Sequence, residues 1–147
     1  MASSGQRFVL GCLIGLAIAL LLVGVVSGTF LRHIVQILPI VVVASVLTRR
    51  PVWGAYAACP IFLFWIVIVV LIWLFLLGLS RVASGHYPAI EVVSTFFMAG
   101  FSIAGVVRCI PLGRPLRPIG RALAVILFAV TQVGAMWVSL LKPIANR

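Results

Sequence analysis

Glu91 is the only side-chain carboxylate in this sequence, and it stands at the start of an apolar stretch. An ionisable side chain inside a membrane is costly, so it is treated first as a functional group. A lone carboxylate of this kind can carry the coupling proton of a small multidrug antiporter. Two plainer interpretations compete with this one. Because Pro88 precedes it by three residues, Glu91 also suits the first turn of a helix at headgroup depth, or an ion pair with a neighbouring arginine.

A stripe of polar and small residues continues from Glu91 along the same stretch. At helical steps of three and four residues it comprises Glu91, Thr95, Met98, Ser102 and Gly105. Residues at these steps share one helix face. The pattern therefore predicts a face that could line a polar path.

The two histidines are candidates for ligand binding. If the chain crosses the membrane five times, Arg32, His33, His86, Tyr87 and Glu91 fall on one side and could converge there. Such a cluster would suit the binding of a lipid headgroup, a quinone or a haem. Loop histidines without ligand-type spacing are more often interfacial residues, and we predict no cofactor.

Three cysteines, Cys12, Cys59 and Cys109, lie in or beside apolar runs without CxxC spacing. Three thiols on one side of a membrane could hold a metal or be acylated. Cysteine also behaves as a small apolar residue when it is buried. We therefore expect the cysteines to pack, and we predict no metal site.

Glycine spacing in the first apolar run indicates helix packing. Gly11, Gly15 and Ala19 recur every four residues, a spacing that lets a second helix approach closely. That second helix could belong to this chain, to a second copy or to another membrane protein. Gln132, near the middle of the last apolar run, should hydrogen-bond to a neighbouring helix, with a substrate contact as the alternative.

The segment 111–121 carries Arg114, Arg117 and Arg121 between prolines and glycines. Its composition predicts a loop without regular helix. The arginines should attract anionic lipid headgroups, at about 1 kcal/mol per charge. An acidic protein partner is the alternative. Nucleic acid is excluded as a partner because no stretch forms a contiguous basic face with base-reading groups.

Composition identifies the solvent that surrounds these residues. The chain has 147 residues, of which 65% are hydrophobic and 8% charged. Soluble domains carry roughly 25% charged residues, so this chain lacks the polar side chains to cover a water-exposed surface. The sequence predicts an all-α, polytopic bundle of transmembrane helices, with the lipid bilayer as its main partner.

Five spans are predicted within a single membrane domain, at residues 8–28, 29–48, 56–79, 89–110 and 122–141. The second span is the weakest, because its uninterrupted apolar part is short and contains Pro39. The alternative is four spans plus a re-entrant or interfacial segment. The third span has no small or polar residue from 61 to 77, so we expect it to face lipid.

Basic residues predict the orientation. With five spans, one side collects Arg7, Arg49, Arg50, Arg108, Arg114, Arg117 and Arg121, and the other collects Arg32, Arg81, Lys142 and Arg147. Arginine and lysine accumulate in cytoplasmic loops. We therefore expect a multi-pass protein of the cell membrane, with a cytoplasmic N-terminus and an outside C-terminus.

Three classes of function remain open on these residues. A non-catalytic subunit, assembly factor or scaffold of a membrane complex is favoured, because catalytic spacing is lacking and the loops are short. A small oligomeric transporter or channel, with Glu91 as its coupling carboxylate, is the first alternative. A membrane-embedded enzyme comes last, since most need paired carboxylates or a nucleophile with a base.

Overall fold

The fold is all-α. In a computed structural model, residues 3–81, 88–113 and 117–145 are described, and they contain five long helices and one short helix but no strand. The five long helices are each long and apolar enough to cross a membrane. The helices are α1 (Ser4–Val26), α2 (Phe30–Arg49), α3 (Pro51–Leu76), α4 (Ala89–Gly113), α5 (Pro118–Ser139) and α6 (Lys142–Ala145).

Local sequence explains where several helices begin and end. The Ser3 hydroxyl accepts a hydrogen bond from the Gln6 backbone N–H at 3.1 Å and so caps α1. Pro51 and Pro118 occupy the first helical positions of α3 and α5, where a missing N–H is harmless. At the end of α3, Gly78 has φ +73° and the Leu79 N–H bonds the Leu74 carbonyl, which is a Schellman ending.

The second predicted span is a complete helix. α2 has 20 residues, which corresponds to about 30 Å at 1.5 Å per residue. Pro39 lies inside it and is buried, and the chain does not reverse direction there. This continuous helix shows that the alternative of a re-entrant segment is wrong. A proline is tolerated inside a membrane helix because neighbouring helices can satisfy the carbonyl that it leaves free.

The predicted loop at 111–121 is wrong in extent. α4 continues through Pro111 to Gly113, and α5 already begins at Pro118. Proline suits both places, since a helix tolerates it at the first position and a membrane bundle compensates for it elsewhere. Arg121 consequently belongs to the first turn of α5.

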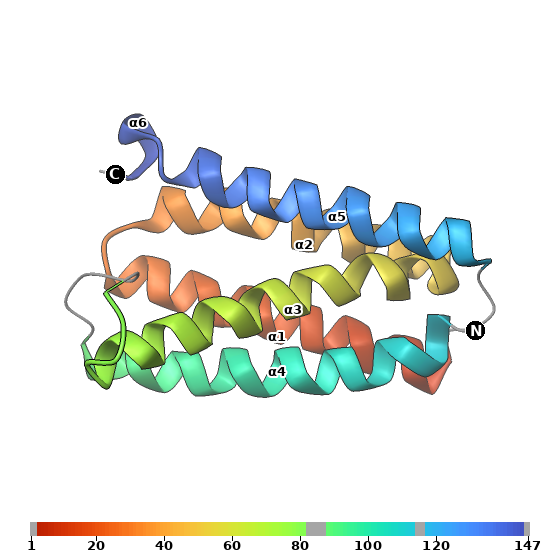
Figure 1. Cartoon of the computed structure of the whole chain (residues 1–147), viewed down its shortest axis with the longest axis horizontal. Helices are drawn as coiled ribbons and strands as arrows, with labels where there is room; N and C mark the ends of the chain where they lie inside the picture. The colour runs from red at the N-terminus through yellow and green to blue at the C-terminus, as the bar shows by residue number, and fades with distance from the viewer. Residues whose placement is uncertain (1–2, 82–87, 114–116, 146–147) are drawn as a thin grey trace.

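α3 occupies the centre of the bundle. It packs against α1, α2, α4 and α5, whereas α5 contacts only α2, α3 and the short α6 among the described residues. In Figure 1, α5 and α4 lie at opposite edges, with the other long helices between them. Most of the run 61–77 is not buried, which agrees with the expectation that it faces lipid, and only Ile61, Phe62, Trp65 and Val69 are buried there. The first half of α3, by contrast, is well buried.

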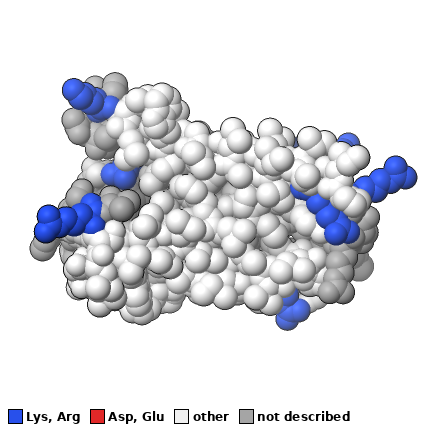
Figure 2. Space-filling view, viewed as in Figure 1, with Lys and Arg blue, Asp and Glu red and all other residues white. Residues whose placement is uncertain are grey.

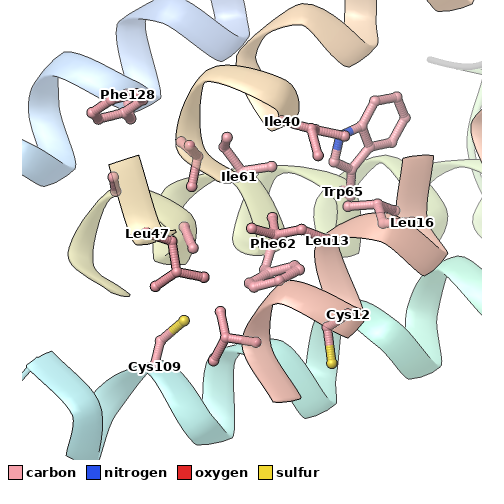
Figure 3. Close-up of a cluster of buried hydrophobic side chains, with 14 of the residues drawn as sticks. Cys12, Leu13, Leu16, Ile40, Leu47, Ile61, Phe62, Trp65, Cys109 and Phe128 are labelled. Carbon is pink, nitrogen blue, oxygen red and sulfur yellow. The ribbon is translucent and has the colours of Figure 1, made fainter. Parts of the chain in front are cut away.

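Small residues allow this burial. Gly54, Ala55, Ala57 and Ala58 of α3 are all buried, and they precede the apolar run on which the prediction rested. A Cβ atom on Gly54 would overlap the Leu47 backbone of α2. The core continues along α3 with Ile61 and Phe62, which are fully buried. Figure 3 shows Phe62 and Trp65 of α3 beside Leu13 and Leu16 of α1.

The outer surface is apolar between two charged ends. Many large apolar side chains are exposed along the helices, among them Leu22, Val67 and Phe97. In Figure 2, Lys and Arg appear at the two ends and the middle of the visible face carries none. A lipid-facing belt between two basic rims explains this distribution.

Candidate functional site

A cavity of about 330 Å³ lies at the end of the bundle where α1 and α3 finish and α2 and α4 begin. All five long helices contribute residues to its wall. Its charged and amide-bearing side chains are Arg32, His33 and Gln36 of α2 and Glu91 of α4. The cavity is the strongest candidate site because it gathers the only acid of the chain with unpaired donors.

The first turns of α2 supply one wall. Arg32, His33 and Gln36 lie at helical steps that place them on the same side of α2. Arg32 Nε is buried and has no hydrogen-bond partner among the described residues. His33 Nδ1 lies 3.0 Å from the Thr29 carbonyl oxygen and 3.2 Å from Thr29 Oγ1. A Cβ atom on Gly24 of α1 would come within 2.9 Å of His33, so the glycine admits the ring.

Glu91 supplies the opposite charge from α4. It stands in the first turn of the helix, but it is 7% exposed and borders the cavity, so it does not face lipid headgroups. The predicted convergence of Arg32, His33 and Glu91 is confirmed, since all three line one cavity. His86 and Tyr87, the other two members, lie outside the described residues.

The stripe that begins at Glu91 faces the bundle interior along its whole length. Glu91, Thr95 and Met98 line the cavity. Thr95 Oγ1 donates to the Val92 carbonyl at 2.7 Å and accepts from Trp73 Nε1 at 2.8 Å. Further along, Ser102 is fully buried, and its hydroxyl has no hydrogen-bond partner within the described ranges. The stripe ends at Gly105, where the Phe62 ring occupies the space of a Cβ atom.

Apolar packing closes the bundle beyond the cavity. One turn past the lining residues lie Leu16 of α1 and Phe62 of α3, both fully buried. In Figure 3, Leu13 is drawn beside Phe62, and Leu16 is drawn beside Trp65. The polar stripe therefore opens onto a chamber in one half of the bundle and is blocked in the other half.

Trp65 forms the part of the cavity wall next to the apolar plug, which consists of the buried side chains of Leu16 and Phe62. Its side chain is 3% exposed, and its indole Nε1 is buried without a hydrogen-bond acceptor in the part of the chain that the structure describes. A buried N–H without a partner costs about 1–3 kcal/mol, so such groups are rare in native proteins. Arg32 Nε and Trp65 Nε1 are thus two donors in one wall that lack acceptors.

Two glutamines of the bundle behave differently. Gln36 donates from Nε2 to Ser139 Oγ at 3.0 Å and lies 3.1 Å from Met136 Sδ, which connects α2 to α5. Gln132 is fully buried, but neither its amide nitrogen nor its oxygen has a partner among the described residues. The hydrogen bond expected of Gln132 is therefore absent among the described residues, and Gln36 is the glutamine that bonds to a neighbouring helix.

The glycine pattern of α1 divides between two surfaces. A Cβ atom on Gly15 would come within 2.7 Å of the Phe101 ring of α4, and Ala19 is buried. Gly11 is exposed and has open space beside it. An apolar groove of about 550 Å³ runs there between α1 and α4, lined by Phe8, Gly11, Cys12, Phe97, Gly100, Phe101 and Ala104.

The cysteines lie toward the opposite end from the cavity. Cys59 of α3 and Cys109 of α4 lie near each other, and all three cysteines are free. Cys12 and Cys109 are buried and Cys59 is half-buried. Within the described ranges, no group of three or more His, Cys, Asp or Glu side chains is arranged to hold a metal ion.

Arginines at this same end rest on aromatic rings. The Arg108 guanidinium lies 5.3 Å from the centroid of the Phe8 ring, and that of Arg121 lies 5.5 Å from the Tyr56 ring. Arg117 is exposed at the N-cap of α5, and Arg114 lies outside the described residues. Cation–π contacts hold Arg108 and Arg121 at the rim of the bundle.

The sequence analysis missed two residues of the cavity wall, Gln36 and Trp65. Gln36 lies three residues after His33, so helical spacing could have added it to the cluster. Trp65 stands in an unbroken apolar run that carries no such signal.

Comparison of the chain with protein-family models, with curated proteins and with solved structures gives no match.

Proposed function

We propose that this chain is a small transporter of the cell membrane that receives its solute in the cavity between the five long helices. The observation that carries the proposal is the position of Glu91, the only acid, in the wall of that cavity. Intramembrane carboxylates that border a cavity are typical of proton relays in transporters. Glu91 would bind and release the coupling proton, and the stripe of α4 would guide the solute.

The orientation belongs to the same proposal. Among the described residues, Arg7, Arg49, Arg50, Arg108, Arg117 and Arg121 lie toward one end, and Arg32, Arg81 and Lys142 toward the other. Six basic residues against three favour a cytoplasmic N-terminus and an outside C-terminus. The cavity then occupies the outer half of the membrane, and the plug at Phe62 separates it from the cytoplasm.

Proteoliposomes with a trapped pH-sensitive dye test the proposal. Small organic acids, amines and neutral solutes would be added outside, and solute-dependent acidification inside would be measured. We expect at least one solute to carry protons inward, Glu91→Gln to abolish this flux and Glu91→Asp to retain part of it. Ser45→Ala is the control, since the Ser45 hydroxyl is exposed and bonds its own helix at Val41. Proton flux that survives in Glu91→Gln would refute the coupling role.

A second candidate, a non-catalytic component of a membrane complex, is favoured by the groove between α1 and α4. Gly11 and Gly100 face open space there, so a helix of a second copy or of another protein could approach closely. We expect Gly11→Leu to fill the groove and to remove the bound chain in native mass measurements after gentle extraction. Gly134→Leu is the control, because Gly134 also faces open space but lies on α5. A monomer in both variants and in the unmodified protein would refute this candidate.

A further inference from the structure

We propose that the solute of the cavity is a small organic anion, with its carboxylate held by Arg32 and Trp65, and that it binds together with a proton on Glu91. This inference rests on the proposed function and names the substrate class for the same site. It concerns three residues of the wall, one each from α2, α3 and α4. Three separate physical arguments support it.

The first argument is the pair of unmatched donors. Arg32 Nε and Trp65 Nε1 are both buried without acceptors among the described residues, and both residues line the cavity, so their side chains would turn toward a ligand to bind it. Donors without acceptors favour a ligand that brings acceptor atoms, and the arginine adds a positive charge. Charge-assisted hydrogen bonds to carboxylates are about twice as strong as neutral ones. An anionic oxygen therefore suits this wall better than an amine, which would add more donors.

The second argument is the character of the remaining wall. Apart from its polar groups, the wall is formed by aliphatic and thioether side chains, among them Val23, Ile68, Ile72 and Met98. The volume of about 330 Å³ lies at the lower end of the range for small-molecule pockets, roughly 300–1,000 Å³. The ligand should accordingly have a short apolar body attached to its charged group.

The third argument is the balance of charge. The titratable or charged groups that the described helices direct to the cavity are Arg32 and His33 of α2 and Glu91 of α4, and α1, α3 and α5 contribute none. An ionised Glu91 would repel a bound carboxylate strongly in so dry a place. A proton on Glu91 removes this repulsion. Anion and proton then favour each other's binding by the same factor, so they enter together and without net charge.

Calorimetric titration in phosphatidylcholine nanodiscs tests the ligand class. Butyrate is the probe, and butyramide and n-butylamine are its neutral and cationic counterparts. We expect butyrate alone to bind, with affinity reduced roughly tenfold to hundredfold in Arg32→Gln and about threefold to tenfold in Trp65→Phe. Arg81→Gln is the matched control, because Arg81 is exposed and does not line the cavity. Binding of the amine in place of butyrate would overturn the inference.

The pH dependence tests the coupling to Glu91. Affinity for butyrate should fall by up to about tenfold per pH unit as the pH rises, since one proton accompanies each anion. Glu91→Gln should bind butyrate with little pH dependence, whereas His33→Gln should keep the slope. A slope that disappears in His33→Gln and persists in Glu91→Gln would overturn the assignment. Arg32→Lys, which retains the positive charge, supplies a second variant if Arg32→Gln does not fold.

Lipid phosphate has the same anionic oxygen chemistry, and nanodiscs with added phosphatidylglycerol separate the two sources. Competition by this lipid would identify a headgroup as the occupant, and unchanged butyrate affinity would support the soluble anion. The two proposals also fail separately. Butyrate binding without transport would overturn the transporter and leave the site. Glu91-dependent transport of amines, without anion binding, would overturn the site and leave the transporter.

Discussion

At the scale of single residues, Gln36 and Gln132 show how differently the bundle treats two buried amides. Gln36 is 2% exposed and bonded to Ser139, whereas Gln132 is fully buried and unbonded. Inside the lipid bilayer, a polar group without a hydrogen-bond partner in the protein cannot form a hydrogen bond with water instead. The two positions therefore invite opposite predictions for the same substitution.

Gln132→Leu should stabilise the bundle by about 1 kcal/mol, because leucine of similar size needs no hydrogen bond. The free energy of unfolding, measured by titration from mild detergent into dodecyl sulfate, gives the comparison. Destabilisation would mean that Gln132 finds a partner in the native membrane, such as a helix of another chain. That result would favour the membrane-complex candidate.

Gln36→Leu should instead destabilise the bundle by about 1 kcal/mol, because the hydrogen bond between α2 and α5 is lost. The same unfolding titration measures it. Ser45→Ala serves as the control here as well, since the Ser45 hydroxyl makes no interhelical bond. An unchanged free energy of unfolding would show that α5 is held by packing alone.

Individual site residues were predictable where their chemistry is unusual in lipid. Glu91, Arg32 and His33 could be grouped from topology alone, because polar residues near span ends of equal parity meet at one membrane face. Trp65 could not be grouped with them. Its role depends on which face of α3 meets the cavity, and a uniformly apolar run carries no periodic signal.

At the scale of helices, close backbone approach determines how α2, α3 and α4 meet. Gly54 lies against the Leu47 backbone, and Gly105 lies against the Phe62 ring. The two residues that these glycines contact, Leu47 and Phe62, are fully buried. Glycine is needed at these points because any Cβ atom would push two helices apart.

Gly54→Ala should destabilise the bundle by about 1–3 kcal/mol, since the added methyl group meets backbone that cannot rotate away. Gly134→Ala, at an open position of α5, should be neutral or stabilise by about 0.5–1 kcal/mol through helix propensity. Unfolding titrations of both variants measure the difference. Equal free energies in the two variants would contradict the close contact between α2 and α3.

The number and type of helices were predictable from hydrophobic length, but their arrangement was not. Five apolar runs near 20 residues predict five helices, because a bilayer requires that length. The start of α3 at Pro51 was missed, since the predicted span of 56–79 left residues 51–55 outside it. The central position of α3 follows from packing against four helices, which no property of its own sequence specifies.

At the scale of the whole molecule, an odd number of long helices separates the two ends of the chain. In Figure 1, the start of α1 and the short helix α6 lie at opposite ends of the bundle. Six basic residues near the start of α1 and at the α2–α3 and α4–α5 junctions, against three at the other end, favour cytoplasmic placement of the first end. Span parity and charge thus support one orientation.

A reporter fused after Arg147 should therefore lie outside the cytoplasm. In a bacterial host, green fluorescent protein at this position should remain dark, and alkaline phosphatase should be active, because each folds in only one compartment. A fusion after Arg117, which follows four of the five long helices, is the matched control and should give the reverse pair of signals. Fluorescence from both fusions would mean that one long helix does not cross the membrane. Reversed signals in both would invert the orientation and would place the cavity with Arg32 and Glu91 in the cytoplasmic half, where an anion would enter from inside the cell.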